Sequence, residues 1–260
     1  MPNLFGFFGR PIVPILLLCA STAQAVALND TGIDFCGDAT TNTANCATVA
    51  VDGGTFPRQD ARYGRDAQAV AGTLIKIGLG SRGFDYTKIA NDGSELSASA
   101  AFGSGAKDWA CTRDNVTGLI WEVKTTSGMR SKDHTYSWYN SNPATNGSDS
   151  GTSSGGTCFM ADHCDTEKFA TDVNAARLCG AADWRMPSKK ELEGLVDYGR
   201  SNPSIAPTYF PNTPSSEFWS GSFYAPLSGA GAWDVDFSSG YANRQSKSSK
   251  YAVRLVRSGQ

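Results

Sequence analysis

Histidine is nearly absent from the chain, and so are long apolar runs beyond its first residues. The only histidines among the 260 residues are His134 and His163, and neither stands in a recognisable serine or cysteine nucleophile motif. Because histidine is the side chain that most often acts as a general base near neutral pH, the sequence gives a catalytic triad little support. After residue 25, no stretch stays apolar over the roughly 20 residues that a membrane-spanning helix needs, so no membrane span is expected.

Net charge is also small, so nucleic acid is not an expected partner. The chain holds 23 Lys and Arg against 25 Asp and Glu, a formal charge of −2, so no general basic field would attract nucleic acid. The end of the chain departs from this balance, because every charged residue after Phe237 is basic. These residues are Arg244, Lys247, Lys250, Arg254 and Arg257. Such a run is usually a solvated face, and the functional alternative is an anion-binding strip for sulfated or acidic glycans.

Residues 1–25 have the pattern of a secretory signal peptide. A basic residue precedes a short apolar run, and the small residues that follow predict cleavage after Ala25 or, as an alternative, after Ala27. Lipidation at Cys19 is disfavoured because Leu18 stands where a small residue is normally required. The mature chain is therefore predicted to be exported, to the periplasm or to the outside and cell surface.

Cysteine usage agrees with export. Six of the 7 cysteines remain after cleavage, and in an exported chain they suggest three disulfides, for which 15 connectivities are open. Pairing by sequence proximity gives Cys36–Cys46, Cys158–Cys164 and, from what remains, Cys111–Cys179. Closing the longest of these loops would stabilise the fold by roughly 4 kcal/mol on the chain-entropy model.

Residues 26–105 are interpreted as a polar lead-in that carries a β-hairpin. A weak strand pattern over 73–77 is followed by a second over 84–89. The N-D-G turn at 91–93 is the strongest short hairpin signal in the chain. The main domain is predicted to follow over residues 106–258.

Capping residues predict two helices in the main domain. Ser188 and Glu191 form a capping-box pattern at the start of a predicted helix over 189–198. An earlier helix is predicted over 167–179, with Thr166 as its N-cap. Short strands are expected after the second helix, so the pattern favours an α+β domain.

Strand alternation predicts which side chains share a face near the C-terminus. In segment 233–237, the apolar side chains alternate with Asp234 and Asp236, so both carboxylates are expected on one exposed face. Glu191 and Glu193 form a second pair near a helix start. Acid–base catalysis needs two groups whose surroundings separate their pKa values, and neither pair offers that pattern.

Several motifs together resemble one bacterial family. They are D-N-V-T-G-L-I-W-E at 114–122, L-C-G-A-A-D-W-R-M-P-S at 178–188, Y-F-P-N-T at 209–213, F-W-S-G-S at 218–222 and V-R-L-V-R at 253–257. This set resembles the Lcl C-terminal domains, a family of unknown function named for the tail of a collagen-like adhesin. The resemblance implies a disulfide-tied C-type-lectin-like fold, with two helices and short antiparallel strands, similar to that of the formylglycine-generating enzymes.

No metal or other cofactor is predicted. A lectin-like fold makes calcium plausible, but the Glu-Pro-Asn and Gln-Pro-Asp signatures of calcium-dependent lectins are absent from the sequence. Cys158, His163 and Cys164 cluster, yet they supply only three of the four ligands of a structural zinc site. In an exported chain the two cysteines are more readily oxidised.

Aromatic residues remain as candidates for ligand contact. Trp121 and Trp184 are expected in the core, and so are Trp219 and Trp233. Segment 222–250 differs, because it mixes Tyr, Ser, Gly, Asn and Arg, a composition typical of adaptable binding loops.

We therefore expect a ligand-binding surface within 222–250. Its predicted contact residues are Tyr224, Asp234, Asp236, Tyr241, Asn243, Arg244 and Lys247. The expected function is a non-enzymatic exported binding module for a surface glycan or a protein. Two alternatives are an enzyme of the formylglycine-generating or another type, although no cysteine follows Cys179, and a structural component of the cell surface.

Overall fold

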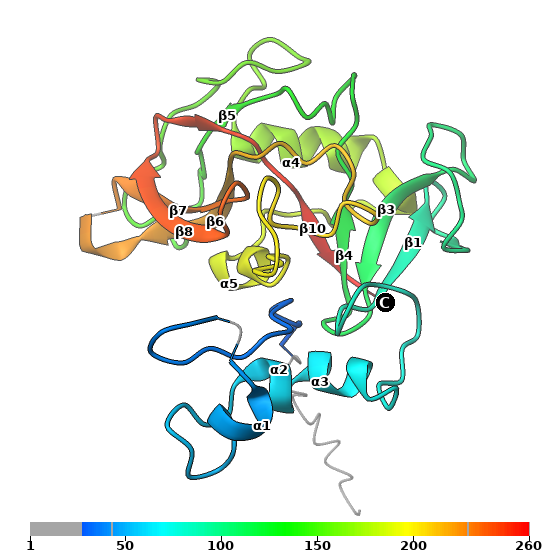
Figure 1. The fold of residues 1–260 in the computed structure, drawn as a ribbon. Coiled ribbons are helices and arrows are strands. Elements are labelled where there is room, and N and C mark those ends of the chain that lie inside the picture. The colour runs from blue at the N-terminus through cyan, green and yellow to red at the C-terminus, as the bar shows by residue number, and fades with distance from the viewer. Residues whose placement is uncertain (1–27, 43, 228, 260) are drawn as a thin grey trace, which may run out of the picture.

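The computed structural model describes residues 28–42, 44–227 and 229–259. The predicted signal peptide, including Cys19, lies outside the described residues. Within the described ranges, no helix has both the length and the apolar character needed to cross a membrane. Figure 1 shows the sheets in the upper part of the molecule and the short lead-in helices as a separate layer below them.

A five-stranded antiparallel sheet has the strand order β10-β4-β3-β1-β2. Its strands are β1 (Tyr86–Ala90), β2 (Glu95–Leu96), β3 (Trp109–Asp114), β4 (Leu119–Glu122) and β10 (Val256–Ser258). The hairpin of β1 and β2 confirms the turn predicted at 91–93, where Gly93 has a φ of 89° that favours glycine. Because β10 pairs with β4, the end of the chain closes onto the start of the main domain (Figure 1).

Two smaller antiparallel sheets complete the main domain. One contains β6 (Glu217–Tyr224), β7 (Gly231–Asp236) and β8 (Tyr241–Ser246), with β8 at its edge. The other pairs β5 (Tyr136–Ser137) with β9 (Lys250–Tyr251). The three-stranded sheet lies at the left of Figure 1, above and beside α5 (Lys189–Glu193).

The capping box predicted at Ser188 is confirmed. The Ser188 hydroxyl accepts the backbone N–H of Glu191, and the Glu191 carboxylate accepts the N–H of Ser188 at 2.7 Å. Helix α5 is shorter than the predicted range 189–198, because its C-cap already lies at Gly194. Its Leu192 is buried in the core, together with Leu195 just beyond the helix.

The other main-domain helix, α4 (Thr166–Ala175), has a different cap from the one predicted. Asp165 is the N-cap, and its carboxylate accepts the backbone N–H of Lys168 at 2.9 Å. The hydroxyl of Thr166 instead donates to the carbonyl of Tyr139 at 2.8 Å. A charged acceptor at this position also interacts favourably with the helix dipole.

The lead-in contains α1 (Cys46–Val49), α2 (Asp60–Tyr63) and α3 (Arg65–Val70), but it lacks one expected strand. The strand predicted over 73–77 is wrong, since those residues are irregular and no strand in the described residues pairs with them. Ile75 is 91% exposed and Ile77 is 77% exposed. Apolar residues without a neighbouring strand satisfy neither the hydrogen-bonding nor the burial needs of a sheet.

All three predicted disulfides are confirmed. The paired Cα atoms are 5.2 Å apart for Cys36–Cys46, 6.5 Å for Cys111–Cys179 and 5.3 Å for Cys158–Cys164. Cys111–Cys179 joins β3 to the 3₁₀ turn η1 (Leu178–Gly180) that follows α4. It therefore connects the five-stranded sheet to the helical part of the main domain.

Buried charges connect several of the motifs inside the main domain. Glu122, Lys124 and Arg254 are at most 1% exposed, and the Lys124 ammonium lies 2.9 Å from Glu122 Oε1. Arg254 donates to the Glu122 carbonyl at 2.6 Å and to the Thr213 hydroxyl at 2.7 Å. Its guanidinium carbon lies 5.1 Å from the centre of the Phe210 ring. These motif residues thus form part of the core. The prediction that the basic run is a solvated face is wrong for Arg254, which is buried.

Tryptophans fill much of the remaining core. Trp121, Trp184 and Trp219 are at most 3% exposed, which confirms their predicted burial. The structure is therefore an α+β fold of two main helices and antiparallel sheets, tied by disulfides. Most of its large motif side chains are buried, so a ligand-binding surface must be formed mainly by other residues.

Candidate ligand-binding face

The residues predicted for ligand contact lie on the three-stranded sheet, but they divide between its two faces. Trp233 of β7 lies opposite Arg244 of β8, and Asp234 lies opposite Asn243. Directly paired residues of antiparallel strands share a face, and successive residues alternate between faces. Arg244 therefore lies on the opposite face from Asp234 and Asn243.

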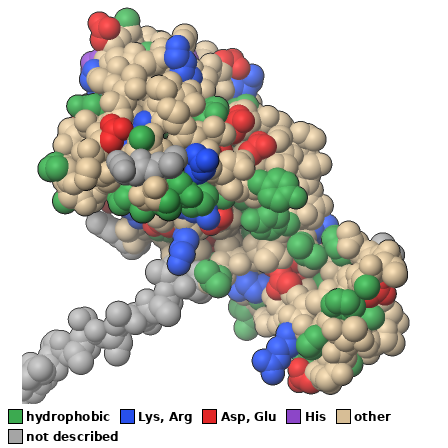
Figure 2. Space-filling view, turned by 90° about the vertical axis from the view of Figure 1, so that its left-hand side faces the viewer, with side chains coloured by type: hydrophobic (Ala, Val, Ile, Leu, Met, Phe, Trp, Pro, Cys, Tyr) green, Lys and Arg blue, Asp and Glu red, His purple; other side chains and the backbone are tan. Residues whose placement is uncertain are grey.

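One face presents two aromatic rings and two cations. We call it the aromatic–cationic face, and it consists of Lys189, Tyr224, Trp233 and Arg244. The Tyr224 and Trp233 rings meet edge to face with their centres 5.2 Å apart. The Arg244 guanidinium carbon lies 5.4 Å from the centre of the Tyr224 ring, and Lys189 Nζ lies 4.3 Å from the centre of a Trp233 ring. Figure 2 shows the side of the molecule on which the three-stranded sheet lies in Figure 1, and basic side chains adjoin apolar ones there.

Helix α5 positions Lys189 at this face. The backbone N–H of Lys189 donates to the Ser222 hydroxyl at 3.0 Å, which holds the start of α5 against β6. The Lys189 ammonium lies 3.2 Å from Glu193 Oε1, one helical turn further on. Trp233 lies beside Lys189 at the start of α5 and stays only partly buried, whereas Val235 is buried in one cluster with Leu192 of this helix.

Trp233 is only partly buried, so its predicted place in the core is wrong. Trp219 provides the contrast, since it is fully buried and its indole N–H donates to the Tyr136 carbonyl at 2.8 Å. Trp219 points toward the main body of the domain, whereas Trp233 lies on the opposite face at the margin of α5. Sequence alternation alone does not distinguish these two surroundings.

Asp234 is buried on the second face, contrary to the prediction of two exposed carboxylates. It is 0% exposed, and neither carboxylate oxygen has a hydrogen-bond partner among the described residues. Burial, together with the negative charge of Glu217, raises the pKa of Asp234 to about 7. Asp236 is half-buried and accepts the N–H of Ser238 at 2.7 Å, so it stabilises the turn between β7 and β8.

Lys247 is buried rather than presented to solvent as predicted. It is 2% exposed, and its ammonium donates to the carbonyl oxygens of Asn146 (2.8 Å) and Asp149. It also lies 4.2 Å from the centre of a Trp138 ring. Lys247 therefore anchors the loop that contains Asn146 and Asp149 to the segment that follows β8.

The basic run near the C-terminus does not form a continuous surface. Lys247 and Arg254 are buried, and Arg257 lies 2.6 Å from Asp183 in an ion pair. The exposed members of the run are Arg244 and Lys250. An anion could therefore meet isolated cations here, of which only Arg244 adjoins exposed aromatic rings.

Tyr241 and Asn243 are exposed on β8, on the opposite face from Arg244. Tyr241 is 71% exposed and lines an open cleft of about 620 Å³ together with Tyr198 and Arg200. The predicted contact residues thus do not converge on one site. Only Tyr224 and Arg244 among them belong to the aromatic–cationic face.

Sequence reasoning missed a cleft of about 480 Å³ beside α4. Its lining includes Tyr139, Glu167, Trp184 and Arg185. The sequence W-R-M at 184–186, within one of the family motifs, was the only sign of this cleft that the sequence offered. Arg185 already makes two hydrogen bonds to Glu191, at 2.9 and 2.7 Å. The cleft therefore offers fewer free charged groups than the aromatic–cationic face.

The cysteine–histidine cluster considered for zinc is joined by a disulfide. Cys158 and Cys164 are bonded to each other, so neither is a thiolate ligand. His163 Nδ1 instead lies 2.9 Å from Asp172 Oδ1 of α4. The observed pairing confirms that oxidation is the state these cysteines adopt.

Comparison with protein families identifies the family of the main domain. The model of the Lcl C-terminal domain matches residues 110–257, and the chain belongs to this family. Comparison with curated proteins gave no match, and comparison with solved structures gave none either. The matched range includes the aromatic–cationic face and leaves the lead-in helices outside it.

Proposed function

We propose that this family member is an exported, non-enzymatic binding module that holds a sulfated or carboxylated glycan on its aromatic–cationic face. The scaffold would be a C-type-lectin-like domain over residues 106–258. Two disulfides, Cys111–Cys179 and Cys158–Cys164, stabilise it. The three disulfides of the chain and its predicted signal peptide support export.

The partial exposure of Trp233 is the observation that carries the proposal. The other tryptophans, all within the described residues, are at most 4% exposed. A tryptophan at the surface presents a broad flat ring, on which the apolar C–H face of a sugar can stack. Tyr224 lies edge to face with it and extends the apolar surface.

The two cations of the face suit an acidic substituent on such a sugar. Arg244 has no ion pair and no side-chain hydrogen bond within the described part of the chain, so its N–H donors remain free for a ligand. A guanidinium binds a sulfate or carboxylate through two parallel N–H···O bonds. Lys189, which pairs with Glu193 at 3.2 Å, places a second cation beside the Trp233 ring, so Arg244 is the main anchor for the acidic group.

Calorimetric titration with a heparin-derived oligosaccharide, and with its desulfated form, tests this function on the mature protein. Trp233→Ala and Arg244→Ala are each expected to weaken binding of the sulfated form about tenfold or more, which corresponds to about 1.4 kcal/mol. Lys250→Ala is the matched control, because it removes an exposed positive charge of β9, which belongs to the two-stranded sheet with β5 and not to the three-stranded sheet. We expect its affinity to stay within about twofold of wild type.

If all three variants bind the sulfated form with the same affinity as the wild-type protein, the aromatic–cationic face does not bind the glycan. Absence of binding by the wild-type protein, combined with recovery of a specific protein partner that Trp233→Ala fails to recover, would favour a protein ligand instead. Both outcomes can be distinguished from misfolding by comparing the thermal melting curves of the variants.

A further inference from the structure

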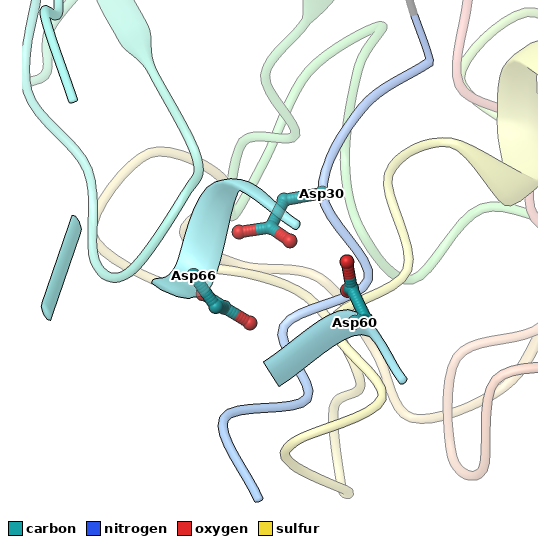
Figure 3. A group of neighbouring side chains, drawn as sticks. All are labelled: Asp30, Asp60 and Asp66. Atoms are coloured by element: carbon teal, nitrogen blue, oxygen red, sulfur yellow. The ribbon is translucent and has the colours of Figure 1, made fainter. Parts of the chain in front are cut away.

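Three aspartates from separate segments of the lead-in converge on one point (Figure 3). Asp30 belongs to the extended N-terminal segment, Asp60 begins α2, and Asp66 lies in the first turn of α3. One carboxylate oxygen from each lies within 4.8 Å of the other two. Carboxylates at this spacing repel one another, so their arrangement requires a compensating positive charge or a proton.

The site is buried, and its carboxylates lack cationic partners in the described part of the chain. Asp30 is 6% exposed and Asp66 is 1% exposed. The Oδ2 atoms of both residues have no hydrogen-bond partner among the described residues. None of the three aspartates forms an ion pair there, although the neighbouring Arg82 pairs with Asp34 and Asp197.

Basic residues near the cluster are bound to carbonyl oxygens instead. Arg65 Nε donates to the Gly83 carbonyl at 2.8 Å. The Lys76 ammonium donates to the Gly80 carbonyl at 2.8 Å, and burial lowers the pKa of Lys76. Neither side chain therefore neutralises the carboxylates by direct contact.

The remaining carboxylate oxygens hold the three side chains in place. Asp66 Oδ1 accepts the N–H of Gly83 at 3.0 Å, and Asp30 Oδ1 accepts the N–H of Thr31 at 2.9 Å. The Thr31 hydroxyl donates to Asp60 Oδ2. A Cβ atom at Gly83 would lie only 1.9 Å from Asp30 Oδ2, so the backbone approaches the carboxylate as only glycine allows. These contacts orient the oxygens before any ligand binds.

We propose that Asp30, Asp60 and Asp66 bind one calcium ion. Calcium takes oxygen ligands at about 2.3–2.6 Å, so ligands on opposite sides of the ion lie up to about 5 Å apart. The spacing of these carboxylate oxygens, within 4.8 Å, meets that limit. The cluster contains no cysteine or histidine, which disfavours zinc and copper, and magnesium requires shorter bonds in a stricter octahedron.

A calcium ion here would connect the lead-in helices to the main domain. The Asn29 amide donates to Asp114 Oδ2 of β3 at 2.9 Å, and the N–H of Tyr198 donates to the Thr31 carbonyl at 2.8 Å. Asp30 lies between these two contacts along the chain. Bonds from the ion to Asp30, α2 and α3 would therefore fix all three segments against the domain.

Titration of the chelator-treated mature protein with calcium chloride at pH 7.5, followed by calorimetry and thermal melting, tests the site. Wild type is expected to bind one calcium ion per chain and to melt at a higher temperature with calcium than with chelator. Asp60→Asn is expected to weaken binding at least tenfold, and the half-buried position should accommodate the amide. Asp52→Asn is the matched control, because this exposed aspartate of the same lead-in lies outside the cluster.

The competing account is a proton shared by Asp30 and Asp66. Burial and the neighbouring Asp66 raise the pKa of Asp30 to about 6, which favours such a proton under acidic conditions. If a proton alone balances the cluster, wild type will bind no calcium at pH 7.5, and the proposal is overturned. Calcium binding that survives both Asp60→Asn and Asp66→Asn, or magnesium affinity equal to that for calcium, would overturn it as well.

Discussion

Different interactions stabilise the main domain and the part of the lead-in that precedes Phe84. The later residues of the lead-in form β1 and β2 and belong to the five-stranded sheet. Two clusters of buried apolar side chains form the core of the main domain, with Trp121 in one and Trp219 in the other. Of the described residues that precede Phe84, none belongs to either cluster. Helices α1 and α2 bury no residue, and α3 buries only Asp66.

The lead-in relies on covalent and polar contacts instead. Cys36–Cys46 closes its first loop, and the aspartate cluster lies between its helices. Several of its apolar side chains remain in solvent, including Val70 (85% exposed) and Ile75 (91%). A disulfide and an ion-binding cluster can thus order a segment that is too short to enclose a core of its own.

The largest difference should appear between a glutamate ion pair buried in the main domain and one exposed at the sheet edge that continues from the lead-in. Glu122→Ala in the main domain leaves Lys124 buried without its ion-pair partner, while Arg254 keeps its bond to the backbone carbonyl of residue 122. We expect a loss of about 5 kcal/mol in the free energy of unfolding. Glu95→Ala breaks the exposed pair with Arg113 and is expected to cost less than about 1 kcal/mol. Urea denaturation measures both values, and equal losses would contradict the comparison.

Removal of the disulfides should also separate the regions. Serine at both Cys111 and Cys179 opens a loop spanning 68 residues, with an expected loss of about 4 kcal/mol and a lower melting temperature for the whole domain. Serine at both Cys36 and Cys46 opens a loop of 10 residues, for which about 3 kcal/mol is expected.

The second pair of substitutions should act locally, because the described residues before Phe84 add nothing to the two apolar clusters. We expect faster proteolysis within residues 28–70 and little change in the melting of the main domain. Limited proteolysis with mass spectrometry locates the cuts. Global unfolding of both variants at the same temperature would show that the lead-in and the domain form one cooperative unit.

The smallest expected effect comes from the exposed Ile75, for which the buried Ile89 is the matched comparison. Ile89→Ala removes a side chain that is 3% exposed in the core and should cost about 2–5 kcal/mol. Ile75→Ala removes one that is 91% exposed and should change stability by less than about 0.5 kcal/mol. A large loss at Ile75 in the same denaturation assay would mean that a partner covers it in solution.

Local signals in the sequence were sufficient for part of the fold. The capping box at Ser188 and the N-D-G turn at 91–93 involve groups only two or three residues apart, so short-range chemistry determines them. The disulfides also followed from sequence proximity, once the cysteine count was known. Thr166 was a less successful choice of cap because Asp165, directly before it, competes for the same position.

The candidate site depended on contacts that sequence patterns do not contain. Lys247 is buried by carbonyl groups from a loop about 100 residues earlier in the chain. Arg254 is buried by Glu122, which lies 132 residues before it. A basic run is read as solvated unless such distant partners are known, and for that reason the predicted strip was wrong.

Strand β8 has a consequence for how the protein can change. It is the edge strand of its sheet, and none of its residues is buried. Substitutions at Tyr241, Asn243 and Arg244 therefore leave the apolar interior intact. Randomising these three positions should yield libraries whose members still fold, in which position 244 varies the aromatic–cationic face and positions 241 and 243 vary the opposite face.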